Sequence, residues 1–215
     1  NLKDILKKKK FLGKLVSVKF KDYKKIKSKI KNSYLRSRTN DENMNFVYAL
    51  SKLLKINEKS FIKSMSSFLG LPHRYEIFFK KKGITFINDS KATSLEATKH
   101  ALASSKNVYW ILGGLPKDKD KIDLRFIKNN IIRSYIIGKN INFFKKQLRN
   151  KIKFSVTKNL KNSISSALKD IKSLKRISNT ILLSPGAASF DQFKNFESRG
   201  NEFKKLSRLY AKKYI

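Results

Sequence analysis

The sequence predicts an α/β protein whose larger part carries a mostly parallel sheet covered by helices on both faces. Beyond residue 75, short apolar runs alternate with longer stretches of helical periodicity, as strands and helices do when they take turns along a chain. Polar or glycine-containing segments follow three of the apolar runs, which is where α/β proteins place their ligands. A break at Gly70, Leu71 and Pro72 separates this part from a lysine-dense part before it.

The chain has 215 residues, 40% of them hydrophobic, which suffices for one full domain with a core and part of another. Its formal net charge of +36 would suit a nucleic-acid partner. Lysine, however, far outnumbers arginine and is spread along the entire chain, whereas readers of phosphates and grooves favour arginine. We therefore expect solvated lysines and no nucleic-acid partner, with a basic nucleic-acid-binding module as the alternative.

The sequence contains no cysteine, so it has no disulfide framework, thiolate nucleophile or cysteine-based zinc site. This is compatible with a cytoplasmic location, which we expect. No apolar run is long enough to cross a bilayer, and the opening residues lack the apolar centre of a signal peptide. We expect no membrane insertion. The chain begins with Asn1 and not with Met, which suggests a fragment.

The first 70 residues predict short elements of both kinds. Residues 15–20 have strand character, while residues 26–35 fit either a second strand or a helical turn. The polar run 37–43 favours a helix start, and apolar residues at helical spacing continue that helix to about Lys55. A second short helix is predicted over residues 57–68.

The remaining residues predict strands and helices in alternation. Strands are expected over residues 75–79, 84–87, 108–112, 134–137, 153–156 and 180–183. Helices are expected over residues 94–104, 124–129, 141–148, 160–174 and 197–212.

Three polar segments follow strands of the predicted sheet, at residues 89–93, 113–117 and 184–189. The carboxyl ends of parallel strands meet at one edge of a sheet, so we expect these loops to converge. Within the first loop, Thr93 and Glu96 fit a capping box in which Thr93 accepts from the helix start and Glu96 reaches back. Asp89 and Lys91 form either a surface ion pair or ligand-binding groups.

Several other motifs have a structural explanation beside a functional one. His73 and His100 lack metal-ligand spacing, and His100 is expected to be solvated. Arg74 is the better ligand candidate, because a guanidinium can bind phosphate or stack on adenine. The Gly113 turn does not match a phosphate loop, and residues 183–191 do not form a nucleophile elbow. We interpret both as binding loops.

Four stretches, in this order, resemble the Mur ligases of peptidoglycan synthesis. They read GLPHR at residues 70–74, INDSKAT at 87–93, LGGLPK at 112–117 and LSPGAASFDQFKNFESRG at 183–200. The resemblance extends over most of residues 37–203. The DQFKNF segment at residues 191–196 is similar to that of the D-glutamate-adding member, and another amino-acid-adding Mur ligase is the alternative.

The resemblance implies a reaction that makes an amide bond. ATP phosphorylates the carboxylate of UDP-N-acetylmuramoyl-L-alanine, and the amine of D-glutamate attacks the acyl phosphate. A tetrahedral intermediate then collapses to the amide, ADP and phosphate. Mg²⁺ and basic side chains stabilise the developing charge in such reactions.

The family pattern also implies residue roles. Asn40 and Asn43 would lie near adenine, and Arg74 and Asp89 would hold the sugar and phosphates of ATP. Lys91 would face the reacting phosphate or the incoming substrate. The catalytic turn would also contain His73, and the D-glutamate pocket would contain Thr93, Lys117, Ser189 and Phe196.

The resemblance implies that residues 1–70 are the end of a central ATP-binding domain and that residues 71–215 are the carboxy-terminal, Rossmann-like domain that binds the amino acid. The turn at residues 70–72 would be a hinge. The UDP-binding domain, the phosphate loop and the magnesium ligands would lie outside this chain. We therefore expect no metal site and no ligation by the chain alone, and a monomer when full length.

Three positions depart from the family pattern. Thr39 replaces a histidine, Ser94 stands where asparagine is common, and Gly186 stands where alanine is common.

Overall fold

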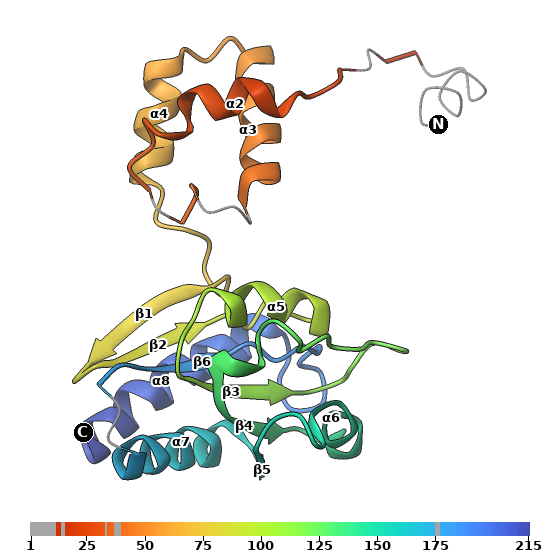
Figure 1. Ribbon diagram of the computed structural model, residues 1–215, viewed down its shortest axis with the longest axis vertical. Helices are drawn as coiled ribbons and strands as arrows, with labels where there is room; N and C mark the ends of the chain where they lie inside the picture. The colour runs from red at the N-terminus through yellow and green to blue at the C-terminus, as the bar shows by residue number, and fades with distance from the viewer. Residues whose placement is uncertain (1–11, 14–15, 33, 37–39, 175–176) are drawn as a thin grey trace. The chain divides into compact units, whose positions relative to one another are not determined.

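A computed structural model describes residues 12–13, 16–32, 34–36, 40–174 and 177–215 (Figure 1). The chain divides into two compact units, Asn1–Leu69 and Gly70–Ile215. No helix among the described residues has the length and apolar character needed to cross a membrane.

The described part of the first unit is helical. It contains α2 (Phe20–Lys27), α3 (Asp41–Leu53) and α4 (Glu58–Ser67). Buried apolar side chains from all three helices form one cluster, because each helix turns an apolar stripe inward. The cluster includes Tyr23, Ile26, Ile30, Met44, Tyr48 and Phe61. The outer side of α3 is also apolar: Phe46, Leu50 and Leu53 are each more than half exposed.

The strand predicted over residues 15–20 is wrong. Residues 16–19 are extended without a partner strand, Leu15 lies outside the described residues, and α2 already begins at Phe20. A strand needs a neighbour for its hydrogen bonds, whereas a helix satisfies its own. Tyr23 and Ile26, three residues apart, both reach the core from one helical face. Over residues 26–35 the described part is a helix end followed by turns, not a strand.

The second unit contains a six-stranded sheet in the order β1-β2-β6-β3-β4-β5. Strand β1 pairs antiparallel with β2, and all other pairs are parallel. The predicted mostly parallel α/β fold is therefore confirmed. The strands are β1 (Glu76–Lys81), β2 (Ile84–Asn88), β3 (Val108–Gly113), β4 (Ile131–Ile137), β5 (Phe154–Lys158) and β6 (Asn179–Leu183).

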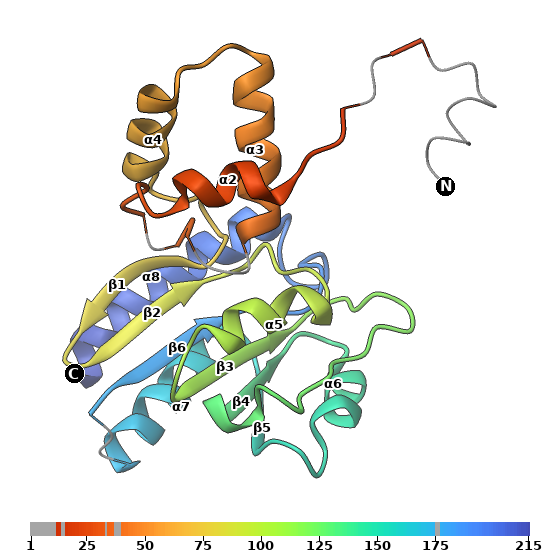
Figure 2. The same ribbon diagram turned by 45° about the horizontal axis from the view of Figure 1, so that its top comes forward.

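Helices cover both faces of this sheet (Figure 2). One face packs against α5 (Leu95–Ala103) and α6 (Ile141–Leu148), and the other against α7 (Leu160–Leu174) and α8 (Phe196–Tyr214). Along β3 the side chains alternate between the two cores, with Trp110 on the first and Tyr109 on the second. Every residue of β3 is buried, as expected for a central strand of a parallel sheet.

The helix predicted over residues 124–129 is wrong. The chain there forms a turn and then a single 3₁₀ turn, η2 (Lys128–Asn130). The Asp123 carboxylate accepts hydrogen bonds from the backbone and side chain of Arg125, and such local bonds compete with a helix. Ile122, Leu124 and Ile127 are buried in the first core. These three do not have the spacing of one helical face, so the segment meets the core as an irregular loop.

Strands β6 and β3 are neighbours in the sheet, yet the chain leaves them toward opposite faces. After β6 it enters α8, which packs on one core, and after β3 it enters the loop that packs on the other. In open α/β sheets, ligands bind where neighbouring strands diverge in this way. Here both loops also touch: Gly113 N donates to Pro185 O at 2.9 Å, and Leu115 pairs with Ala188.

Candidate active site

Asp89 follows the last residue of β2 and is 9% exposed. Its Oδ1 accepts from Tyr75 N at 3.0 Å, and its Oδ2 accepts from Ser184 Oγ at 2.7 Å. Burial raises the pKa of Asp89 to about 6, although these two hydrogen bonds and the charge of Arg74 act in the opposite direction. The structure therefore holds a carboxyl group between two strand ends, poised to change its charge near neutral pH.

His73 lies in the turn before β1, with a positive φ of 62° and an exposed fraction of 6%. Its Nδ1 is 2.9 Å from Asn88 Nδ2, and its backbone N donates to Glu76 Oε2 at 2.9 Å. With the amide nitrogen of Asn88 as donor, Nδ1 accepts and the ring proton lies on Nε2. Burial and the nearby charge of Lys204 lower the pKa of His73, which favours this neutral ring.

Phe196, the first residue of α8, lies between two other candidates. Lys91 Nζ is 3.8 Å from the centroid of the Phe196 ring, and the His73 ring meets the same ring edge-on at 5.9 Å. Asn195 caps the helix by accepting from Ser198 N at 2.7 Å. The structure thus brings Lys91, His73 and Phe196 together at a capped helix N-terminus.

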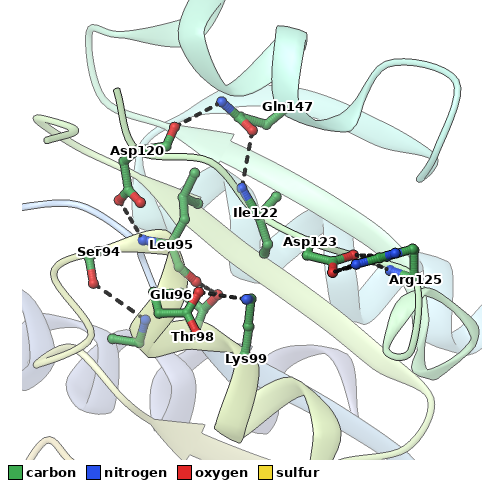
Figure 3. A network of polar contacts seen from close by, with 11 residues as sticks. Ser94, Leu95, Glu96, Thr98, Lys99, Asp120, Ile122, Asp123, Arg125 and Gln147 are labelled. Atoms are coloured by element: carbon green, nitrogen blue, oxygen red, sulfur yellow. Dashed lines mark hydrogen bonds and ion pairs between the residues drawn. The ribbon is translucent and has the colours of Figure 1, made fainter. Parts of the chain in front are cut away.

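The capping box predicted at Thr93 is wrong by one residue. Ser94 is the N-cap of α5 and accepts from Ala97 N at 3.3 Å, while Glu96 forms an ion pair with Lys99 (Figure 3). Two backbone bonds at Ala92, to Asp89 O and from Gly186 N, extend the loop past Thr93 before the helix starts. The Thr93 side chain is therefore not used as the cap.

The α5 start is also held by the loop after β3. Leu95 N donates to Asp120 Oδ2 at 2.7 Å, which places a carboxylate at the helix N-terminus (Figure 3). Gln147 on α6 fixes this loop, because its side chain accepts from Ile122 N and donates to Asp120 O. Lys117, in the same loop, is exposed and makes no ion pair with any of the described residues.

Ser189 is 2% exposed in the loop after β6, and its carbonyl accepts from Gln192 N and Phe193 N. In the same loop Gly186 has a φ of 64°, and a Cβ there would lie 2.7 Å from Leu95 Cδ2. A residue with a side chain would be strained at this position.

Arg199 is a buried residue of the site that sequence reasoning missed. It is 1% exposed and donates from Nε to Ser90 Oγ at 3.0 Å. A signal was present, because Phe196, Arg199, Gly200 and Phe203 share one face of α8 at spacings of three and four residues. An arginine within such an apolar stripe is rarely buried without a specific partner.

Asn40 and Asn43 belong to the first unit. Asn40 precedes α3 and donates from Nδ2 to Tyr34 O at 2.8 Å, and Asn43 is exposed on the first turn of that helix. In the second unit Arg74 is exposed. Thr39 lies outside the described residues. Searching the residues that the structure describes finds no group of three His, Cys, Asp or Glu side chains arranged for a metal ion.

No protein-family model matches the chain. Curated relatives do. A protein of Rickettsia felis is 34% identical over 180 residues, covering 84% of this chain and 40% of the relative. A protein of Wolbachia sp. subsp. Brugia malayi is 40% identical over 166 residues, covering 77% of this chain and 33% of the relative. Both are named UDP-N-acetylmuramoylalanine--D-glutamate ligase.

Over most of its length, this chain is similar to Mur ligases. It spans two fifths or less of the length of these Mur ligase relatives. A solved Mur ligase structure agrees in fold: MurF from Acinetobacter baumannii matches with a TM-score of 0.54 at 13% identity, over 80% of this chain and 38% of that one. The α/β architecture is thus shared within the Mur ligases despite low sequence identity.

Proposed function

We propose that this chain is the carboxy-terminal part of a ligase that joins D-glutamate to UDP-N-acetylmuramoyl-L-alanine at the expense of ATP. The observation that carries the proposal is the meeting of three strand-end loops at one sheet edge, in a chain related to ligases of that name. Within those loops lie an acid, a lysine and hydroxyl groups, which suit binding of a charged amino acid and a nucleotide.

The second unit, Gly70–Ile215, would be the amino-acid-binding domain, and the first the end of the central ATP-binding domain. The apolar outer side of α3 supports the second assignment. Phe46, Leu50 and Leu53 are 55–57% exposed there. A helix that is apolar on opposite sides is typical of a larger core, in which both sides are buried. The relatives' greater length leaves ample chain to form that core.

D-glutamate would bind beside the start of α8. Its carboxylates need positive charge and N–H donors, which a capped 19-residue helix offers at its N-terminus. Lys117 would pair with one carboxylate, and Thr93 and Ser189 would donate hydroxyl hydrogen bonds. Phe196 would line the pocket while its ring stays held between Lys91 and His73.

ATP would lie on the side of Asp89. The Asp89 carboxylate has lone pairs beyond those used by Tyr75 and Ser184, so it could accept from a sugar hydroxyl. Arg74 is free to reach phosphate, and Asn40 and Asn43 would contact adenine. Mg²⁺, when bound, would neutralise phosphate charge, and we place its ligands in the part of the relatives that this chain does not span.

Lys91 and His73 would have different roles in the reaction. Lys91 would leave the face of Phe196 to meet the negative charge that develops on the acyl phosphate and the tetrahedral intermediate. His73, neutral and bonded through Nδ1 to Asn88, would hold the Phe196 ring in place. We place the reaction in the cytoplasm, as a monomer, because its substrates are a nucleotide-linked sugar and ATP.

The proposal is tested with the natural protein, including whatever residues precede Asn1. ADP release should require both UDP-N-acetylmuramoyl-L-alanine and D-glutamate, and L-glutamate should not replace D-glutamate. Residues 1–215 alone should release none. Release that is independent of D-glutamate in the natural protein, or coupled ligation by residues 1–215, would contradict the proposal. Tight, salt-sensitive, sequence-preferring DNA binding would favour the nucleic-acid alternative.

A further inference from the structure

Arg199 carries its charge into the interior of the second unit. The side chain is 1% exposed, and it forms no ion pair with any described residue, Asp191 being the acid that acts on it from a distance. Burial lowers the pKa of Arg199 to about 10, which still leaves it charged at neutral pH. Burying a charge without an ion pair costs free energy, so hydrogen bonds to the guanidinium must offset that cost.

Those hydrogen bonds join two loops of the candidate site to helix α8. Arg199 donates from Nε to Ser90 Oγ at 3.0 Å, and from Nη2 to Ser90 O at 2.9 Å and to Ala187 O at 3.0 Å. The Ser90 hydroxyl in turn donates to Phe196 O at 2.8 Å, which links the loop of Ser90 to the start of α8. Ser90 precedes Lys91, Ala187 lies two residues before Ser189, and Phe196 begins α8.

The guanidinium also faces a third loop. A Cβ placed on Gly114 would lie 3.2 Å from Arg199 Nη1, so the two are in contact range. Nη1 is buried and has no hydrogen-bond partner among the described residues. Gly114 leads directly to Lys117. Two loops are therefore bonded directly to Arg199, and the start of α8 is bonded to it through Ser90, whereas the loop of Lys117 contacts the guanidinium without a hydrogen bond.

We propose that Arg199 is the positioning residue of the D-glutamate pocket. It fixes the segments that carry Lys91, Ser189 and Phe196 relative to one another through a single planar group, while the loop of Lys117 is held by other bonds, among them the pairing of Leu115 with Ala188. This inference rests on the proposed function, because it assigns Arg199 a role in binding that substrate. Arg199 touches no reacting atom and acts through its neighbours.

The geometry explains why this residue is an arginine. Its Nε and Nη2 point to acceptors on two different loops at fixed angles, which a lysine ammonium on a flexible stem does not reproduce. Methionine would fill a similar volume without donating, and would leave the carbonyl groups of Ser90 and Ala187 without a partner. Arg199→Lys is therefore the informative change, because it keeps the charge and removes the fork.

The first test is kinetic and uses the natural protein. Arg199→Lys should raise KM for D-glutamate about tenfold or more, as expected for lost charge-assisted hydrogen bonds, and change KM for ATP less than about twofold. Phe144→Leu, on the buried side of α6 in the first core, serves as the control that loses stability without touching the site. Equal effects of Arg199→Lys on both substrates, or an equal rise in KM with Phe144→Leu, would overturn the inference.

Chemical rescue adds a readout that a general loss of stability would not produce. In Arg199→Ala, low guanidinium chloride should restore affinity for D-glutamate, while the same concentration of sodium chloride or urea should not. If guanidinium does not restore affinity, and if the ratio of KM for D-glutamate to KM for ATP in Arg199→Ala equals that of the wild-type protein, Arg199 does not position the D-glutamate pocket.

Hydrogen exchange on residues 1–215 separates this inference from the proposed function. In Arg199→Lys, amides of residues 90–93 and 186–190 should exchange faster, while those of β4 keep the wild-type rate. Uniformly faster exchange would show a purely structural arginine and overturn the inference. A second outcome is possible, in which exchange is faster only at these amides but the wild-type natural protein does not use D-glutamate. That outcome would refute the proposed function and the substrate assigned to Arg199. It would leave only the finding that Arg199 connects the loops of Ser90 and Ala187.

Discussion

Asp89 Oδ2 accepts a 2.7 Å hydrogen bond from the hydroxyl of Ser184, a residue 95 positions later in the chain. The bond joins the loops that follow two neighbouring parallel strands, β2 and β6. It is buried, as is the Asp89 carboxylate itself. Asp89 thus helps to join the ends of β2 and β6, while burial disfavours the charged form of its carboxyl group.

Asp89→Asn should stabilise the second unit at neutral pH. The pKa of about 6 in the folded protein lies above the ordinary aspartate value of 3.8, so the folded state binds the proton more tightly. Wild-type stability therefore falls as pH rises from about 4 to 6 and stays lower above that, whereas Asn does not titrate. We expect a gain of roughly 3 kcal/mol at pH 7 that disappears below pH 4.

Urea unfolding of both proteins from pH 3.5 to 8 measures this difference. Ser184→Ala is the companion variant. Without the hydroxyl donor the charged form of Asp89 loses a hydrogen bond, so the pKa of Asp89 should rise further. The pH range over which stability falls should then extend to higher pH than in the wild-type protein. A stability difference that does not change with pH would contradict the prediction.

Gly200→Ala should destabilise the protein although alanine favours helices. A Cβ at this position on α8 would lie 2.2 Å from His73 Nδ1 and 2.9 Å from Asn88 Oδ1. Helix propensity predicts a gain of about 1 kcal/mol, while forcing a buried ring aside costs about 1–3 kcal/mol. We expect a net loss in thermal unfolding and a changed His73 ring signal in NMR spectra. Asn201→Ala, an exposed position of the same helix, is the control, and a gain in Tm for Gly200→Ala would refute the packing argument.

Lys117→Ala should separate binding from stability. The side chain is exposed and forms no ion pair with a described residue, so unfolding free energy should change by less than about 0.5 kcal/mol. In the natural protein KM for D-glutamate should rise, because a carboxylate loses its cation. Lys119→Ala, two residues away and also exposed, is the matched control. An unchanged KM would remove Lys117 from the pocket.

Asp120→Ala should loosen the start of α5. The carboxylate accepts from Leu95 N at 2.7 Å, and loss of such a group at a helix N-terminus costs about 1 kcal/mol. Asp120→Asn keeps an acceptor without the charge and should lose less. Denaturant unfolding ranks the three proteins. Asp118→Ala, exposed in the same loop, is expected to behave as wild type, and a comparable loss there would show that the effect is not due to the cap.

The main features of the second unit could be predicted because they depend on local patterns. Every predicted strand from residue 75 onward exists, with ends shifted by up to three residues, because each is a short apolar run between turn signals. The convergence of loops after β2, β3 and β6 followed from the rule for parallel strands and is seen in the bonds of Asp89, Gly113 and Ala188. Four of the five predicted helices are also present.

What failed depended on tertiary partners. Residues 16–19 have a strand-like sequence but no neighbouring strand. Residues 124–129 contain apolar side chains that reach the core from an irregular loop, because their spacing does not fit one face of a helix. The cap moved from Thr93 to Ser94 because backbone bonds at Ala92 set the register of the loop. Arg199 was missed because its partners, Ser90 and Ala187, become neighbours only in the folded sheet.

The position of β6 has a consequence for synthesis of the protein. β6 is the last strand in the sequence but lies in the middle of the sheet, between β2 and β3. Until residues 179–183 leave the ribosome, a nascent chain therefore holds two separate halves, a hairpin and a three-stranded piece, each with an open edge. Folding of this domain should be late and slow, and chaperones should meet those two edges first.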